Sequence, residues 1–216
     1  MSSEPALRTS PLEARLDRDV TLGFKPLVLD RGEVLGVVGG NGSGKTSFLR
    51  ILAGSLDTQR GEIRLFGQDV TRLSAGGRFA AGLRYLPQKD NVFQRLTVSE
   101  NITVSSMRMP NLVSPLGRLA SLSPSLTART SAPAATLSGG ERQILALAMT
   151  FSNPHGAVYL LDEPFAGLSQ IASKAIAETV RLWLKELSAS AIIVEHSRPL
   201  LRSVCDRVVD IDLLVE

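Results

Sequence analysis

A glycine-rich segment between two apolar runs constrains this chain more than any other feature of its sequence. Residues 33–38, EVLGVV, are typical of a short buried strand, and GGNGSGKT at 39–46 leads directly into SFLRILAG. The segment matches G-x-x-x-x-G-K-[ST] in the strand–loop–helix context that this pattern requires. Such a loop curls so that its backbone N–H groups point inward, at the positive end of the following helix. The sequence therefore predicts a phosphate-binding loop.

Different residues of this loop are expected to bind different parts of a nucleotide and its metal ion. Lys45 is expected to reach the β- and γ-phosphates, and Thr46 to place its hydroxyl on Mg²⁺, which needs only one or two protein oxygens. A glycine-rich turn that only packs is the alternative, and the surrounding strand and helix argue against it. The residues expected to bind ATP are Gly39, Gly40, Asn41, Gly42, Ser43, Gly44, Lys45 and Thr46.

Two adjacent carboxylates follow a second apolar run. VYLLDEP places Asp162 and Glu163 at the end of a predicted buried strand, where open α/β sheets place their ligands. We expect Asp162 to hold Mg²⁺, directly or through water, and Glu163 to orient and deprotonate the water that attacks the γ-phosphate. An isolated Asp-Glu pair is more often a solvated turn, but the phosphate loop in the same chain favours a functional pair.

Short apolar runs separated by helical segments indicate an α/β fold. The continuous runs at 34–38, 157–161 and 191–194 are typical of central parallel strands that are buried on both faces. Further strands are expected at 61–67 and 83–88, with a helix between the last two central strands. Between about Gln94 and Ala135 the sequence is rich in Ser, Pro, Leu and Arg, which indicates an inserted helical lobe that is partly loop.

Composition excludes few functions, but it limits the expected partners and the cellular compartment. The 24 Lys and Arg residues exceed the 21 Asp and Glu residues by three, which is too few to argue for nucleic acid or anionic lipid as a partner. The single Cys205 allows no internal disulfide, no apolar run approaches the length of a membrane span, and the N-terminal residues lack a signal-peptide pattern. We expect a cytoplasmic protein whose contact with a membrane, if any, depends on a partner.

Five motifs together resemble the ATP-binding cassette (ABC) ATPases. GGNGSGKT, LPQ at 86–88, LSGGERQ at 137–143, LLDEP at 160–164 and VEH at 194–196 follow the family order. The resemblance implies a P-loop NTPase (RecA-like) core with a small antiparallel β subdomain and an inserted α-helical signature subdomain. It divides a single domain, 1–216, into a core lobe of about 1–93 and 150–216 and a helical lobe of about 94–149.

The family also gives a role to the paired glycines of LSGGERQ, which cost backbone entropy at the start of an apolar helix. In the family this segment caps the γ-phosphate of ATP held by the other subunit of a head-to-tail dimer. The resemblance implies that Ser138 donates its hydroxyl and that the N–H groups of Gly139 and Gly140 face the phosphate of the second chain. Glu141 stands where the commonest family form has Gln.

Two further residues take roles from the same resemblance. Gln88 corresponds to the Q-loop glutamine, which contacts Mg²⁺ or the attacking water and moves with the helical lobe. His196 corresponds to the switch histidine, which touches the γ-phosphate. His155, in SNPHG, is expected to be a surface residue.

Two further departures from the family pattern bear on function. Ser169 stands where the family commonly has an aspartate that links the two sites across the dimer, so communication between the sites is expected to differ. Residues 1–23 contain no Phe, Tyr or Trp to stack on adenine. Phe24 is the nearest candidate, but its position close to the phosphate loop favours a core role.

The resemblance implies an ATPase subunit of a transporter, similar to those of branched-chain amino acid importers. Its cofactors would be ATP and Mg²⁺, and its partners transmembrane permease subunits and a second ABC ATPase, in a homodimer or a heterodimer. This places the chain on the inner face of the cell membrane, with no nucleic acid partner expected. A non-transport ABC ATPase of DNA repair, chromosomes or translation and a weakly hydrolysing regulatory module are the alternatives.

Overall fold

The computed structural model describes residues 4–17, 20–106, 115–152 and 157–215, and a five-stranded parallel sheet lies at its centre. The strand order is β12-β5-β11-β10-β9. The bounds are β5 Val34–Val38, β9 Leu83–Leu86, β10 Val158–Asp162, β11 Ser190–Glu195 and β12 Arg207–Asp210. The three runs predicted to be central strands are the three inner strands, and every residue of them is buried. The predicted α/β fold is confirmed.

The register of the parallel strands brings the predicted functional segments to one edge of the sheet. Asp162 at the end of β10 is opposite Val194, and Glu195 at the end of β11 is opposite Val38 at the end of β5. Parallel strands that end in register deliver their following loops to the same edge. The phosphate loop, the acidic pair and His196 therefore meet although they are far apart in the sequence.

Helices cover both faces of this sheet. Helix α1 (Lys45–Ala53) packs on one face with residues such as Phe48 and Leu52, and α7 (Gln170–Glu186) packs on the other with Val180 and Trp183. The sheet side chains alternate between these two apolar clusters. The remaining helices of the core are α2 Ala75–Ala80, α8 Arg198–Val204 and the short 3₁₀ helix η2 Ile211–Leu213.

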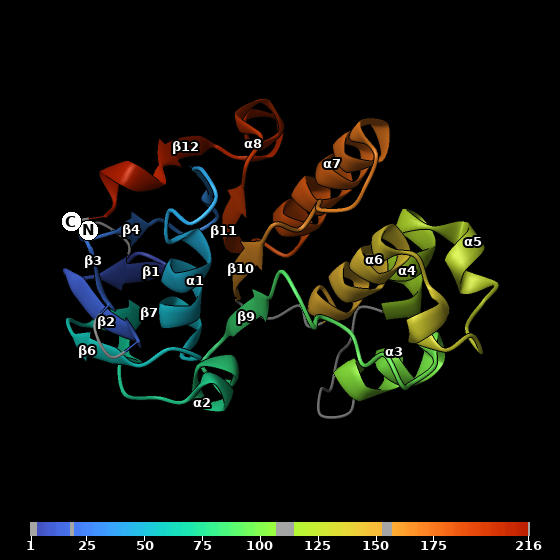
Figure 1. Cartoon of the computed structure of the whole chain (residues 1–216), viewed down its shortest axis with the longest axis horizontal. Helices are drawn as coiled ribbons and strands as arrows, with labels where there is room; N and C mark the ends of the chain where they lie inside the picture. Colours follow the sequence, from blue (N-terminus) through green and yellow to red (C-terminus); the bar gives the residue numbers. More distant parts are fainter. Residues whose placement is uncertain (1–3, 18–19, 107–114, 153–156, 216) are drawn as a thin grey trace.

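Two small antiparallel sheets lie beside the parallel sheet, on the side opposite α3–α6 (Figure 1). Their strand orders are β4-β1-β7-β8 and β3-β2-β6. The predicted strand at 61–67 is shorter than expected, because the chain turns through Phe66 and Gly67, both at positive φ. The bounds are β1 Leu7–Thr9, β2 Leu12–Asp17, β3 Val20–Phe24, β4 Val28–Leu29, β6 Thr58–Arg60, β7 Ile63–Leu65 and β8 Gln68–Asp69.

The helices between β9 and β10 gather at the other end of the molecule (Figure 1). They are α3 Val98–Ser106, α4 Pro115–Leu122, α5 Pro124–Thr127, η1 Ala134–Thr136 and α6 Gly139–Thr150. Residues 115–136, within the segment rich in Pro and Ser, are thus largely helical. Arg118 on α4 joins this group to the core, since its guanidinium donates to Glu186 on α7 at 2.9 Å and lies over the Trp183 ring. None of the described helices is both long and apolar enough to cross a bilayer.

Candidate functional site

The segment at 39–46 forms a curled loop that ends in a helix. Gly44 has φ +91°, a conformation that side chains rarely adopt, and α1 begins at the next residue. A Cβ at Gly39 would lie 2.3 Å from Cγ2 of Ile211, so this end of the loop also needs glycine. These two positions explain why the turn from β5 into α1 requires glycine.

Lys45 points back into its own loop. Its ammonium donates to the carbonyl oxygens of Gly39 at 2.9 Å and Gly40 at 2.6 Å, and lies 3.5 Å from the Ser43 hydroxyl. The residue is buried although it carries a charge. A buried ammonium needs its three donors satisfied. The loop therefore holds this cation at the place where an anionic ligand would take over its hydrogen bonds.

Asp162 and Thr46 form the floor of the site. The Thr46 hydroxyl donates to Oδ1 of Asp162 at 3.2 Å, and the carboxylate is fully buried at the end of β10. Burial raises the pKa of Asp162 above its usual value, opposed by the hydrogen bond from Thr46. The predicted pair of hard oxygen donors is thus brought together from two elements 116 residues apart.

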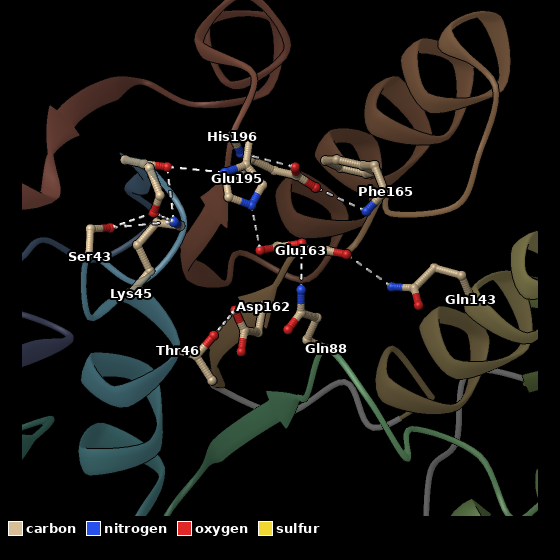
Figure 2. A network of polar contacts seen from close by, with 12 residues as sticks. Ser43, Lys45, Thr46, Gln88, Gln143, Asp162, Glu163, Phe165, Glu195 and His196 are labelled. Atoms are coloured by element: carbon tan, nitrogen blue, oxygen red, sulfur yellow. Dashed lines mark hydrogen bonds and ion pairs between the residues drawn. The ribbon is translucent and has the colours of Figure 1, made fainter. Parts of the chain in front are cut away.

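Glu163 lies at the centre of the network in Figure 2. Its backbone has φ +49°, which is uncommon outside glycine, and its side chain reaches partners from two other segments. The amide nitrogen of Gln88 donates to Oε2 at 2.7 Å, and Nε2 of His196 lies 2.8 Å from Oε1. Both carboxylate oxygens are therefore engaged by residues that the sequence singled out.

The ring of His196 joins this carboxylate to the phosphate loop. Its Nδ1 lies 3.1 Å from the carbonyl oxygen of Gly39, and its Nε2 lies 2.8 Å from Oε1 of Glu163. The imidazole therefore bridges the residues that follow β5 and β10.

Glu195 is a buried residue of the site that the sequence analysis did not single out. Its Oε1 accepts from the backbone N–H of Phe165 at 3.1 Å, and its Oε2 from the N–H of His196 at 3.3 Å. Burial raises the pKa of Glu195 from its usual 4.5 to about 7. The signal in the sequence is a carboxylate at the end of the apolar run AIIV. This side chain ties the strand end that carries His196 to the loop that carries Glu163.

A cavity of about 460 Å³ opens beside the phosphate loop. Loop residues, Gln88 and Glu163 line one part, and Leu16, Val20 and Leu22 from β2 and β3 line another. Leu16 and Val20 are 41% and 47% exposed, which is high for aliphatic side chains in a folded chain. Phe24 is fully buried against Phe48, with ring centroids 5.0 Å apart, so its expected core role is confirmed.

The segment LSGGERQ lies at the start of α6, and none of its residues is in the described lining of this cavity. Ser138 caps the helix: its hydroxyl accepts from the N–H of Glu141 at 3.2 Å, and the Glu141 carboxylate accepts from the N–H of Ser138 at 2.8 Å. Gly139 is exposed, and a Cβ there would meet nothing within 4 Å. A Cβ at Gly140 would lie 3.1 Å from Leu168, so this glycine allows a close contact inside the chain.

The fold thus gathers most of the predicted site residues but not all of them. The loop 39–46, Gln88, Asp162, Glu163 and His196 converge, whereas Ser138, Gly139 and Gly140 are absent from the described lining of the cavity beside the loop. Ser169 caps α7, since its hydroxyl accepts from the N–H of Ala172 at 3.2 Å. His155 lies outside the described residues.

Known proteins resemble this chain in sequence and in structure. The family described as "ABC transporter" matches residues 26–166. A probable branched-chain amino acid transport ATP-binding protein of Archaeoglobus fulgidus is 33% identical, over 78% of this chain and 72% of its own length. A probable ABC transporter ATP-binding protein of Azorhizobium caulinodans is 35% identical, over 83% of this chain and 63% of its own length.

A solved structure supports the same fold. It is the dimeric structure of an ATP-binding cassette in a post-hydrolysis state, bound to ADP and phosphate, and it matches with a TM-score of 0.78 at 19% identity. The match covers 94% of this chain and 93% of that one. The predicted core with its antiparallel and helical subdomains is confirmed. The chain belongs to the ABC transporter family, as an ATP-hydrolysing nucleotide-binding subunit.

Proposed function

We propose that this chain binds ATP with Mg²⁺ in the cavity beside the phosphate loop and hydrolyses it with Glu163 as general base. The observation that carries this proposal is the convergence of Gln88, Glu163 and His196 at the end of that loop. A carboxylate held between an amide and an imidazole can orient a water and accept its proton. His196 and Lys45 would stabilise the negative charge on the transferred phosphoryl group.

Thr46, which lines the cavity, and its hydrogen-bond partner Asp162 fit a magnesium ion. The Thr46 hydroxyl and the buried Asp162 carboxylate are 3.2 Å apart and are the oxygen donors that Mg²⁺ prefers. Asp162 is fully buried, and a cation would offset the cost of holding it ionised there. Gln88 is the proposed third donor, through its amide oxygen. The bound ion would neutralise charge on the β- and γ-phosphates.

The contacts of Glu163 describe a resting arrangement. His196 and Gln88 each contact one oxygen of Glu163, so the carboxylate is turned towards protein partners rather than towards a water. We propose that ATP draws His196 towards the γ-phosphate and so frees one oxygen of Glu163. Lys45 would move its donors from the carbonyls of Gly39 and Gly40 to the phosphates in the same step.

The signature residues are proposed to act on the ATP of a second cassette. Ser138 and Gly139 are exposed at the N-terminus of α6 and lie outside the described lining of the cavity beside the phosphate loop. A helix N-terminus with an exposed glycine lets a phosphate approach backbone N–H groups closely. A head-to-tail dimer, of two copies or of this chain and a different cassette, would bring the two halves together.

We propose that aliphatic side chains replace the missing aromatic as the surface for adenine. Leu16, Val20 and Leu22 line the same cavity as the phosphate loop, and the first two are strongly exposed. Such a wall contacts a purine face through dispersion and the loss of water. Val20→Asp should raise KM for ATP without lowering kcat; an unchanged KM would remove this wall from the site.

The permease is proposed to contact an apolar groove between the lobes, taken as about 94–149 and the rest of the chain. This groove, about 400 Å³, is lined by Phe79, Phe93 and Val104, all more than 40% exposed, and by residues 84–87 and Asn91. The groove adjoins Gln88, so a partner that moves this segment can change the contact between Gln88 and Glu163. The partner would hold the chain on the inner face of the membrane. The name of the archaeal relative makes branched-chain amino acids the first cargo to test.

The substitution Glu163→Gln tests the proposed chemistry. It keeps the shape of the side chain and removes its basicity, so steady-state ATP hydrolysis should be abolished while ATP-Mg still binds. Size-exclusion chromatography with ATP should show a stable dimer for this variant. Rapid turnover by Glu163→Gln would remove Glu163 from the role of base, and a monomer at saturating ATP would exclude the shared site.

A further inference from the structure

The last residue of LSGGERQ, Gln143, has no role in the proposed chemistry, yet it lies where three segments meet. It is on the second turn of α6 and only 5% exposed. Its Nε2 donates to the main-chain oxygen of Glu163 at 3.3 Å (Figure 2). Its Oε1 accepts from Nδ2 of Asn91 at 2.8 Å. One buried amide thus joins the signature helix, the segment after Gln88 and the residue that carries the base.

The two ends of this bridge belong to functional surfaces. Asn91 lines the apolar groove together with Phe79 and Phe93, and it also lines a second cavity with Gln143 and Gly139. Glu163 is held at φ +49°, a conformation that needs support from its surroundings. A displacement of Asn91 in the groove would therefore shift the main chain of Glu163, because the side chain of Gln143 contacts both residues.

Two glutamines hold Glu163 from different sides. Gln88 binds its carboxylate at 2.7 Å, and Gln143 binds its main chain. Only the second contact leaves the carboxylate free to move while fixing the backbone from which it extends. The chemistry also requires an amide at 143, because the same side chain must accept from Asn91 and donate to a carbonyl.

We propose that Asn91 and Gln143 form a relay that sets the orientation of Glu163 according to the position of the groove. Gln143 is a positioning residue: it touches neither phosphate nor water in this scheme. The inference rests on the proposed function, since it takes the groove as the permease contact and Glu163 as the base. It adds a path from groove to base besides the one through Gln88.

Steady-state hydrolysis of ATP-Mg by the intact chain tests the relay. Gln143→Met keeps the length of the side chain and removes both hydrogen bonds, so kcat should fall about tenfold with KM unchanged, as small misplacements of catalytic groups do. Asn91→Ala should lower kcat less. In the double variant the effect of Asn91→Ala should vanish, because it acts through Gln143. The control is Gln68→Met, the same exchange on an exposed strand residue, which should leave kcat unchanged.

Hydrogen exchange without nucleotide gives a second readout that does not depend on hydrolysis. Gln143→Met should speed exchange in the peptide that contains Glu163 and Phe165, and leave exchange in the centre of β5 unchanged. An unchanged kcat in Gln143→Met, single effects that multiply in the double variant, or unaltered exchange near Glu163 would each overturn the relay. Absence of ATP hydrolysis by the unmodified chain would instead count against the proposed function, and exchange would then decide the relay.

Discussion

The N-termini of α1 and α6 use glycine for different physical reasons. Before α1, Gly44 takes φ +91° and the loop closes around a buried Lys45, with no side-chain cap on the helix. Before α6, Gly139 and Gly140 belong to the helix itself, and Ser138 forms a capping box with Glu141. In the first case glycine permits a backbone turn, and in the second it leaves a regular helix without side chains at its entrance.

This difference separates residues that meet within one chain from a surface that we propose acts on the ATP of a second cassette. The loop before α1 meets Thr46, Asp162 and His196 within the same chain. The entrance of α6 presents exposed Ser138 and Gly139.

Removing the cation at the first helix should have the largest effect. Lys45→Met should lower ATP hydrolysis by about 100- to 1,000-fold, the cost of losing one donor to a developing phosphate charge. Steady-state assays and calorimetric titration with ATP-Mg would measure turnover and binding. Arg50→Met, an exposed cation on the same helix, is the control and should keep normal turnover. A loss of less than tenfold in Lys45→Met would show that this loop does not carry the phosphate contact.

Mixing two inactive variants should restore activity if the two helix ends act on one ATP from different chains. Lys45→Met disables the loop, and Gly139→Val places a branched side chain at the entrance of α6. A 1:1 mixture should recover about one quarter of the normal rate, because half the dimers are mixed and each has one intact site of two. Recovery should depend on protein concentration. A mixture as inactive as its parts would place both ends in the same chain or require both sites at once.

Adding one methyl group at each glycine of α6 should change stability in opposite directions. Gly139→Ala meets open space and lowers the entropy of the unfolded chain, so it should stabilise the fold by about 0.5 kcal/mol. Gly140→Ala meets Leu168 at 3.1 Å and should destabilise it by about 1 kcal/mol. Urea unfolding measures both. Gly139→Ala should also hydrolyse ATP more slowly despite its greater stability, and shifts of equal sign would contradict the assigned contacts.

The stability of the fold should depend on pH in opposite ways through Glu195 and through Glu141, although both effects are small. Burial raises the pKa of Glu195 to about 7, so its carboxyl destabilises the fold increasingly as pH rises from about 4.5 to 7. Hydrogen bonding to the N–H of Ser138 lowers the pKa of Glu141, so its contribution is present above pH 4.5 and lost as pH falls. In urea unfolding, Glu195→Gln should gain stability over the unmodified chain above pH 7, and Glu141→Gln should lose it. The same sign for both variants at pH 8 would contradict these environments.

Much of the fold and of the chemistry was predictable because its signals are local. The pattern from Gly39 to Thr46 predicts a loop whose conformation depends on neighbouring residues, and apolar runs of four or five residues predict the inner strands. The short strands of the antiparallel sheets were mostly missed, since segments of two or three residues such as β4 and β8 carry no periodicity. The individual helices at 115–127 were not predicted, because proline and serine are typical of loops. Proline can also begin a helix, as Pro124 does.

The phosphate loop, the carboxylate pair and the signature segment can be recognised in the sequence, because each is a short run of residues in fixed order. The contacts that hold them together depend on the tertiary structure. The link from Gln143 to Glu163 spans 20 residues and that from His196 to Gly39 spans 157. Contacts at such separations depend on the register of the parallel strands and on the packing of α6. Pairings of this kind leave no pattern in a single sequence, since the motif around each residue does not show which distant atom that residue contacts.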